Sequence, residues 1–257
     1  MKIKSALIGY TGFIGSNLLN FKKDIVKFNS KNIHNIRNQS FDTVICAATS
    51  SKIWIAKKKP TEDKKNIMSL IDDLKTIKAN KFILISTSEV YGKKKNCLES
   101  NVNLKNINTN YGLNRLMLET FIEKNFNNNY VLRLPIVYGK NFSKNCIYDL
   151  INNNEIHKLN GSDLIQIYNV ANLKKDINFV IKNRIQKLNI SSKPVKLSFL
   201  ANKFFKIQLN SKKNYRKINI KSIYGQNNGY YFSQNKTLKD LSLFLKEINI
   251  LNFVFQI

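Results

Sequence analysis

Acid/base chemistry is suggested by residues 110–115, where the sequence NYGLNR places Tyr111 four residues before Arg115. On a helix this spacing puts both side chains on one face. A tyrosine has a pKa of about 10 in water, so proton exchange near pH 7 needs about 4 kcal/mol of phenolate stabilisation. A cation about 4 Å away supplies roughly that amount at an effective dielectric near 20. Tyr111 is therefore a candidate for acid/base chemistry, with Arg115 as the cation that would lower its pKa.

A second candidate site is the glycine-rich loop GYTGFIG, which carries Gly9, Gly12 and Gly15. It follows an apolar run predicted to be a strand and opens a predicted helix, which is the context of a dinucleotide-binding loop. Glycines allow the tight turn, the approach of backbone to a pyrophosphate and close helix–sheet packing. The helix N-terminus would add free N–H groups and a positive dipole. With only nine glycines in 257 residues, this spacing argues against coincidence.

The segment after the predicted second strand bears on the choice of dinucleotide. About 20 residues beyond the first glycine, NAD-binding folds carry an acidic residue that binds the adenosine ribose. Residues 28–31 read FNSK and contain no carboxylate. Asn29 or Ser30 could bind a 2′-hydroxyl, whereas Ser30 with Lys31 could hold a 2′-phosphate. This favours NADP, with NAD left open.

The elements that must position these residues alternate along the first half of the chain. Apolar runs predict buried strands at 2–9, 24–28, 41–49, 81–85 and 130–134. Helices are predicted at 13–21, 64–77 and 111–124. Such alternation implies right-handed crossovers and an α/β fold with a Rossmann-like, doubly wound parallel sheet. The apolar face of helix 111–124 is predicted to be formed by Leu113, Leu116, Met117, Thr120 and Phe121.

The pattern loosens from about residue 140. Helix candidates remain at 147–151, 173–181, 195–205 and 237–245. We predict that residues 1–140 form a dinucleotide-binding domain and that residues 141–257 form a small C-terminal substrate-binding lobe. Because no Pro/Gly-rich linker separates them, the lobe is expected to pack on the domain as one structural unit.

Composition excludes several classes of function. A net charge of +27 is compatible with binding to nucleic acid or to an anionic membrane. The lysines are scattered throughout, and no helix-turn-helix, zinc finger or aromatic-plus-basic RNA motif is present. We therefore expect an enzyme that attracts anionic ligands, not a nucleic-acid binder. No apolar run of about 20 residues and no signal peptide is found, so no membrane partner is expected.

The three cysteines point to the compartment. Cys46, Cys97 and Cys146 lie far apart and match no zinc spacing. They are therefore expected to be free thiols in a reducing cytoplasm. We predict a cytoplasmic protein without a metal site.

Six motifs, in order, carry a resemblance to a known family: GYTGFIG (9–15), CAATS (46–50), STSEVYG (86–92), NYGLNR (110–115), RLPIVYG (133–139) and IQIYNVANL (165–173). As a set they resemble the extended short-chain dehydrogenases/reductases of the NAD-dependent epimerase/dehydratase family, which modify nucleotide sugars. The resemblance covers roughly residues 1–182. It implies cofactor contacts from the residues Gly9, Thr11, Gly12, Phe13, Ile14, Gly15, Asn29, Ser30, Ala47, Ala48, Tyr111, Arg115 and Pro135. Family members commonly dimerise through two helices, so a homodimer is also implied.

The resemblance assigns roles to three side chains. In that family a Ser/Thr, a Tyr and a Lys act together, and the matching positions are Thr87, Tyr111 and Arg115. Tyrosine exchanges the hydroxyl proton during hydride transfer, Ser/Thr orients the hydroxyl, and lysine holds the nicotinamide ribose. Arginine keeps the charge but donates in a fixed fork, so the ribose contacts must differ. We expect an active but modified site; the alternative is a catalytically silent NAD(P)-binding module.

Residues 86–92 narrow the reaction. Nucleotide-sugar dehydratases carry an Asp-Glu pair where this chain has Ser88 and Glu89, and a serine cannot replace the acid. UDP-glucuronate decarboxylases have Thr-Ser-Glu there and form the alternative; Glu89 is then a catalytic candidate. We predict an NAD(P)-dependent oxidoreductase or epimerase that acts on a nucleotide sugar or similar sugar alcohol. Pro60, Asp63 and Asn66 follow the third strand, near where cofactor and substrate would meet, without an assigned role.

Overall fold

The computed structural model describes residues 4–49, 53–92 and 95–254. The chain forms two compact units. The first unit comprises Met1–Lys93, Glu99–Leu134 and Ala171–Asn189, and the second comprises Lys94–Leu98, Pro135–Val170 and Ile190–Ile257. The units thus interleave along the sequence, because the chain returns to the first unit after residue 170. The expected division at residue 140 stays a prediction.

A six-stranded parallel sheet forms the centre of the first unit, in the order β10-β6-β4-β3-β1-β2. Its strands are β1 (Ser5–Ile8), β2 (Ile25–Phe28), β3 (Ser40–Cys46), β4 (Lys78–Thr87), β6 (Asn129–Leu134) and β10 (Lys187–Asn189). β1 pairs with β2 on one side and with β3 on the other, and Ile8 lies opposite both Phe28 and Cys46. The strand order therefore reverses at β1. In such sheets ligands bind outside the carboxyl ends of the strands that flank this switch point.

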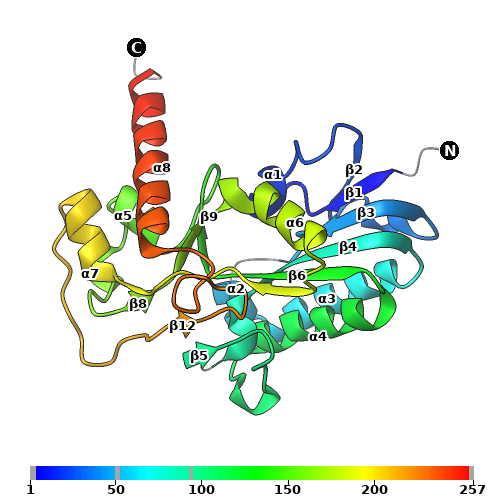
Figure 1. The fold of residues 1–257 in the computed structure, drawn as a ribbon, viewed down its shortest axis with the longest axis horizontal. Coiled ribbons are helices and arrows are strands. Elements are labelled where there is room, and N and C mark those ends of the chain that lie inside the picture. Colours follow the sequence, from blue (N-terminus) through cyan, green and yellow to red (C-terminus); the bar gives the residue numbers. More distant parts are fainter. Residues whose placement is uncertain (1–3, 50–52, 93–94, 255–257) are drawn as a thin grey trace. The chain divides into compact units, whose positions relative to one another are not determined.

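Helices cover both faces of this sheet (Figure 1). One face carries α1 (Phe13–Ser16) and α6 (Leu173–Lys182); the other carries α2 (Ile53–Lys58), α3 (Pro60–Leu74) and α4 (Asn110–Asn125). Short 3₁₀ turns lie at η1 (Ile33–Ile36), η2 (Ser88–Tyr91) and η3 (Leu104–Asn106). The predicted apolar stripe of α3 is buried in the core through Ile67, Leu70, Ile71 and Leu74. The doubly wound α/β fold is confirmed.

The predicted helix at 13–21 is wrong in length, since α1 ends at Ser16. The Phe13 carbonyl would accept the backbone N–H of Asn17 in a longer helix. Instead it accepts the Ser16 hydroxyl at 3.0 Å and the Asn17 side-chain amide at 2.8 Å. The Asn17 N–H donates to the Ile14 carbonyl. Side-chain bonds of this kind compete with helical backbone bonds and end the helix.

The predicted apolar face of α4 is correct only in part: Met117 and Phe121 pack against the core, and Leu116 is half-buried. Leu113 and Thr120 are exposed, and the buried stripe is instead formed by Tyr111, Gly112, Asn114, Arg115, Leu118, Glu119 and Ile122. Polar and charged side chains occupy much of this stripe, and they are buried because they pair with groups on neighbouring elements. The face of α4 that turns inward is thus the one that carries candidate chemistry.

The second unit is built from short pairs of strands and three helical segments. Its strand pairs are β5 (Lys95–Cys97) with β12 (Asn219–Ile220), β7 (Ile136–Tyr138) with β9 (Ile167–Asn169), and β8 (Leu164–Ile165) with β11 (Val195–Lys196). The helical segments are α5 (Cys146–Ile151), α7 (Leu197–Leu200) continued by the π-helix η6 (Ala201–Phe205), and α8 (Gln234–Val254). The shorter turn η4 (Ile156–Lys158) also belongs to this unit, and η5 (Val170–Asn172) lies where the chain returns to the first unit. Tyr138, Ile147, Leu200 and Leu241 belong to a separate core cluster within the second unit.

Candidate active site

The glycine loop begins at Gly9, directly after β1. Gly9 has a φ of +84°, a left-handed conformation that other residues rarely adopt. Its N–H donates to the Phe28 carbonyl at 2.7 Å, which ties the loop to the end of β2. A Cβ at Gly9 would lie 2.5 Å from the carbonyl oxygen of Ala47, the residue after β3. The loop and the segment after β3 therefore approach each other as bare backbone.

Gly12 and Gly15 complete the turn. The Gly12 N–H donates to the Gly9 carbonyl at 3.0 Å, and a Cβ at Gly15 would lie 2.1 Å from that same oxygen. The result is a backbone cradle at the carboxyl ends of β1 and β3, and it fits the pyrophosphate of a dinucleotide. Because α1 has only four residues, a phosphate in this cradle would gain little from a helix dipole and would depend on the backbone amides of the loop.

The segment after β2 is held to the loop by Asn29. Its side-chain amide donates to the Tyr10 hydroxyl at 3.2 Å, and its side-chain oxygen accepts the Lys31 N–H at 2.9 Å. Its backbone N–H donates to the side chain of Asn32 at 2.7 Å. These local bonds engage Asn29, whereas Ser30 and Lys31 are exposed. The Ser30 hydroxyl and the Lys31 ammonium group are therefore exposed where they could bind the 2′-phosphate of a ribose.

The other residues predicted to bind cofactor fall into three groups. Thr11 and Ala48 are exposed. Phe13, Ile14 and Ala47 are half-buried. Pro135 directly follows β6 and belongs to the second unit, unlike the others, which all lie in the first.

The acid/base candidates are assembled by two turns in the first unit. Thr87 ends β4 and caps η2, where its Oγ1 accepts the Glu89 N–H at 3.2 Å. Thr109 caps α4, and its Oγ1 accepts the Gly112 N–H at 3.1 Å. A Cβ at Gly112 would lie 2.5 Å from the Glu89 carbonyl oxygen. The glycine thus allows η2 to approach the first helical turn of α4, where Tyr111 lies.

Tyr111 and Arg115 share one face of α4, as their spacing predicts. The Arg115 Cζ lies 4.1 Å from the centroid of the Tyr111 ring, and both residues are buried. The two terminal guanidinium nitrogens donate to the two carboxylate oxygens of Asp63 on α3, at 3.0 and 3.1 Å. Asn114 donates to the same carboxylate at 2.7 Å. Arg115 is therefore one half of a buried ion pair, which the sequence did not predict.

The pKa of Tyr111 follows from this environment. Burial raises it above its usual value near 10, and this effect exceeds the lowering caused by the charge and hydrogen bond of Arg115. The charges of Glu89 and Asp63 raise the pKa further. Arg115 thus lowers the pKa of Tyr111, as the spacing predicts, but it does not outweigh burial. The cation is matched by a carboxylate, and the phenol is removed from water.

Asp63 and Asn114 are the site residues that sequence reasoning missed. Asp63 follows the third predicted strand, and its local sequence indicates no role. A buried arginine requires a partner, because an unpaired buried charge costs several kcal/mol. The sequence has only 16 acidic residues against 43 Lys and Arg, so few carboxylates could pair with Arg115. The presence of one in the segment after the third strand was the signal that could have identified Asp63.

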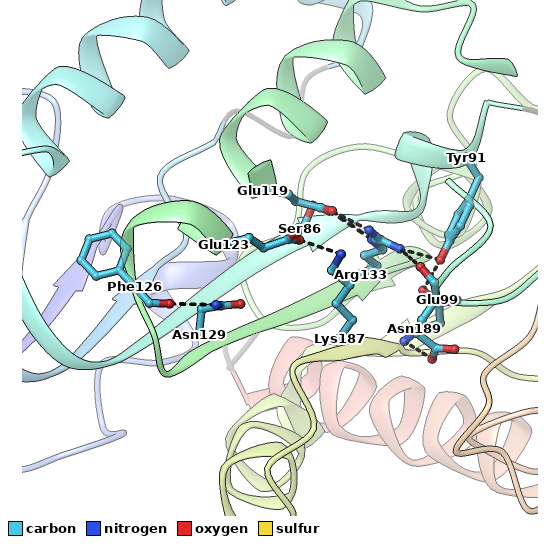
Figure 2. Close-up of polar contacts among 10 residues, drawn as sticks. All are labelled: Ser86, Tyr91, Glu99, Glu119, Glu123, Phe126, Asn129, Arg133, Lys187 and Asn189. Carbon is cyan, nitrogen blue, oxygen red and sulfur yellow. Dashed lines mark hydrogen bonds and ion pairs between the residues drawn. The ribbon is translucent and has the colours of Figure 1, made fainter. Parts of the chain in front are cut away.

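A second buried charge network fixes the turn that carries Thr87 and Glu89 (Figure 2). The Arg133 guanidinium on β6 donates to the Glu119 carboxylate on α4 at 2.6 Å and to the Tyr91 hydroxyl at 2.7 Å. Tyr91 in turn donates to the Asn189 side chain at 2.8 Å, and burial raises its pKa to about 12. Ser86 also donates to Glu119. Tyr91 of η2 is thereby linked to α4, β6 and β10 through buried side chains.

We expect Arg133→Met to lower the free energy of unfolding by about 3–5 kcal/mol, since Glu119 would be left as an unpaired buried carboxylate. Urea unfolding measures this. Lys187→Met is the matched control, because the Lys187–Glu123 pair at 2.9 Å is about one-third exposed and its loss should cost at most about 1 kcal/mol. Equal losses in the two variants would contradict the role assigned to the buried network.

Three observations bear on metals, membranes and thiols. In the part of the chain that the structure describes, no cluster of three or more His, Cys, Asp or Glu residues is placed to hold a metal ion. Among the same residues no helix has both the length and the apolar character needed to cross a membrane. Within these described residues, Cys46, Cys97 and Cys146 are buried and form no disulfide.

The family model described as NAD dependent epimerase/dehydratase family matches residues 6–172. No curated protein matches the chain. The fold is similar to that of a dTDP-4-dehydrorhamnose reductase from Bacillus anthracis in complex with NADP, with a TM-score of 0.65, 19% identity, and coverage of 85% of this chain and 91% of that one.

Two epimerases show the same likeness in fold. A UDP-N-acetylglucosamine 4-epimerase from Methanobrevibacter ruminantium in complex with UDP-N-acetylmuramic acid gives a TM-score of 0.65, 16% identity, and coverage of 85% of this chain and 88% of that one. A UDP-glucuronic acid 4-epimerase from Bacillus cereus in complex with UDP-glucuronic acid and NAD gives a TM-score of 0.62 at 18% identity, with coverage of 84% of this chain and 87% of that one.

Proposed function

Because the chain belongs to the NAD-dependent epimerase/dehydratase family, we propose that it is an NAD(P)-dependent oxidoreductase or epimerase that acts on a nucleotide sugar or a similar sugar alcohol. The observation that carries this proposal is the backbone cradle in which Gly9 and Gly15 leave no room for a Cβ. It stands at the switch point of the sheet, where doubly wound folds bind dinucleotides. The substrate class is supported by the similar folds crystallised with UDP-sugars.

Different residues of the first unit are proposed to bind the cofactor and to carry out proton transfer. The loop amides around Gly12 bind the pyrophosphate, and the nicotinamide supplies or accepts the hydride when bound. Tyr111 holds the exchangeable proton on its hydroxyl, and Thr87 orients the substrate hydroxyl. Glu89 is half-buried beside them and contributes negative charge. A homodimer and a cytoplasmic location stay predictions from the sequence.

Ser30 and Lys31 support NADP as the preferred cofactor, because both are exposed and no carboxylate follows β2 to repel a 2′-phosphate. A thermal-shift titration with NAD, NADH, NADP and NADPH tests the proposal. We expect NADP and NADPH, each at about 100 times its Kd, to stabilise the protein by about 2.7 kcal/mol. This corresponds to a rise of roughly 5–10 °C in Tm. Lys31→Ala should weaken the response to NADP and NADPH and leave that to NAD and NADH unchanged.

The alternative of a silent module has its own outcome. If only an Arg115→Lys variant responded to the dinucleotides, the arginine would have dismantled the cofactor site. If neither protein responded, the cradle would not be a phosphate-binding loop and the proposed function would fail. A response of the wild-type protein justifies a screen of nucleotide sugars for turnover.

A further inference from the structure

Near the carboxyl end of α3, Asp73 is a fully buried carboxylate. Arg37 Nε donates to its Oδ1 at 2.7 Å, and His34 Nδ1 lies 2.8 Å from the same oxygen. Both partners come from the segment between β2 and β3, and both are exposed. Asp73 therefore anchors η1, whose Ile36 is also buried in the core of the first unit.

The second oxygen of Asp73 shows that stability alone explains this carboxylate poorly. Asp73 Oδ2 is buried and has no hydrogen-bond partner among the described residues. A buried polar atom without a partner costs free energy, and an apolar side chain of similar size would fill the same place without that cost. The carboxylate adds what an apolar side chain cannot, which is a fixed binding point for His34 and Arg37.

The segment that Asp73 anchors begins with a closed turn. The Asn32 N–H donates to the Asn29 carbonyl at 3.2 Å, which makes Ser30 and Lys31 the two central residues of a β-turn. The Asn32 side chain closes this turn a second time, because its Oδ1 accepts the Asn29 N–H at 2.7 Å. Its amide group donates to the Lys27 carbonyl of β2 at 3.1 Å. The turn thus presents the Ser30 and Lys31 side chains from a fixed backbone.

The turn and the anchor are connected through η1. The Asn35 N–H donates to the Asn32 carbonyl at 3.1 Å, and the Arg37 N–H donates to the His34 carbonyl at 3.3 Å. Hydrogen-bonded turns therefore follow one another without a break from residue 29 to residue 37. A shift of η1 relative to α3 would carry the turn with it.

We propose that Asp73 is a positioning residue for the cofactor: by anchoring η1 it holds the turn of residues 29–32 where Ser30 and Lys31 can bind the 2′-phosphate of NADP. This inference rests on the proposed function and adds to it a residue of another element that sets the preference between the two dinucleotides. Charge-assisted hydrogen bonds need their atoms about 2.7–2.9 Å apart, so a displaced turn loses them. NAD carries only a hydroxyl group at this position, and its pyrophosphate is bound by the cradle instead.

The test compares the dissociation constants of NADP and NAD, measured by calorimetry on the wild type and on Asp73→Ala. We expect the variant to bind NADP about 10-fold more weakly, which corresponds to the loss of one hydrogen bond to a charged group. Its dissociation constant for NAD should equal that of the wild type. Asp72→Ala is the matched control, because Asp72 is the neighbouring carboxylate on α3, is exposed and pairs with Lys75 at 2.7 Å. Both dissociation constants should be unchanged in this control.

Asn32→Ala covers the case in which Asp73→Ala does not fold. It breaks the link between η1 and the turn at a half-buried position, so it should also weaken the binding of NADP and leave that of NAD unchanged. Asn35→Ala removes an exposed amide three residues later and is the control for this variant. Its backbone bond to Asn32 persists, and its two dissociation constants should match those of the wild type.

The ratio of the two dissociation constants separates positioning from stability. A role of Asp73 limited to stability would lower the Tm of Asp73→Ala and leave this ratio at the wild-type value, which would overturn the proposal. Equal losses for NADP and NAD would overturn it as well, because the cradle would then be disturbed and not the turn. A wild-type protein that binds NADP no more tightly than NAD would contradict this inference and leave the proposed function intact. Binding of neither dinucleotide would contradict the proposed function itself, and the inference with it.

Discussion

Replacing Tyr111 with phenylalanine is expected to lower kcat by about 10²–10⁴-fold, which is the usual contribution of a positioned general acid or base. The ring, its packing and the cation–π contact with Arg115 would persist, whereas the hydroxyl and its hydrogen bond with Arg115 would be lost. The stabilisation by the dinucleotide should therefore remain close to that of the wild type. The measurement is steady-state turnover of the nucleotide sugar found by screening, combined with the thermal-shift titration.

Tyr130→Phe is the control for this change. Tyr130 is also buried, but it lies near the amino end of β6, at the edge of the sheet opposite to the carboxyl ends where the cradle is placed. Its kcat should equal that of the wild type. If Tyr111→Phe kept more than half of the wild-type kcat, Tyr111 would be a packing residue and another group would move the proton.

The second large effect is expected at Gly15. A Cβ there would lie 2.1 Å from the Gly9 carbonyl oxygen, and this atom belongs to the backbone and cannot swing aside. Gly15→Ala should therefore cost about 1–3 kcal/mol or more in the free energy of unfolding and abolish dinucleotide binding. Urea unfolding and the thermal-shift titration measure the two losses separately.

Gly12→Ala distinguishes the roles of the two glycines. Its Cβ would lie 3.3 Å from the Gly9 carbonyl oxygen, and its φ of −76° suits any residue. This variant should fold with nearly wild-type stability yet lose the response to dinucleotides, since the added methyl group would face the pyrophosphate. A Gly12→Ala protein that binds normally would place the phosphates elsewhere. A Gly15→Ala protein as stable as the wild type would contradict the tight turn.

The fold could be predicted from sequence because its signals are local. The strand before Gly9, the apolar stripe of α3 and the strand stopped by Pro135 each depend on side chains a few residues apart. The loop motif likewise needs only glycine spacing between a strand and a helix. These features place the cradle without knowledge of any long-range contact.

The state of the acid/base site could not be predicted in this way. The spacing of Tyr111 and Arg115 predicts that they share one face of α4, and their contact in the structure confirms it. The partner of Arg115 comes from α3, 52 residues away in sequence, and no periodicity reveals it. The same limit explains why the buried face of α4 was predicted only in part: hydrophobicity alone cannot identify buried charged residues whose partners lie on other elements.

The return of the chain to the first unit has a consequence for synthesis on the ribosome. β10, an edge strand of the parallel sheet, lies at Lys187–Asn189, beyond a long stretch of the second unit. While those intervening residues are being made, β6 is the outermost strand on that side, and its unpaired backbone groups can join another chain. The nascent protein is thus open to misassembly until residue 189 has left the ribosome. A fragment that stops at residue 170 would retain that open edge permanently.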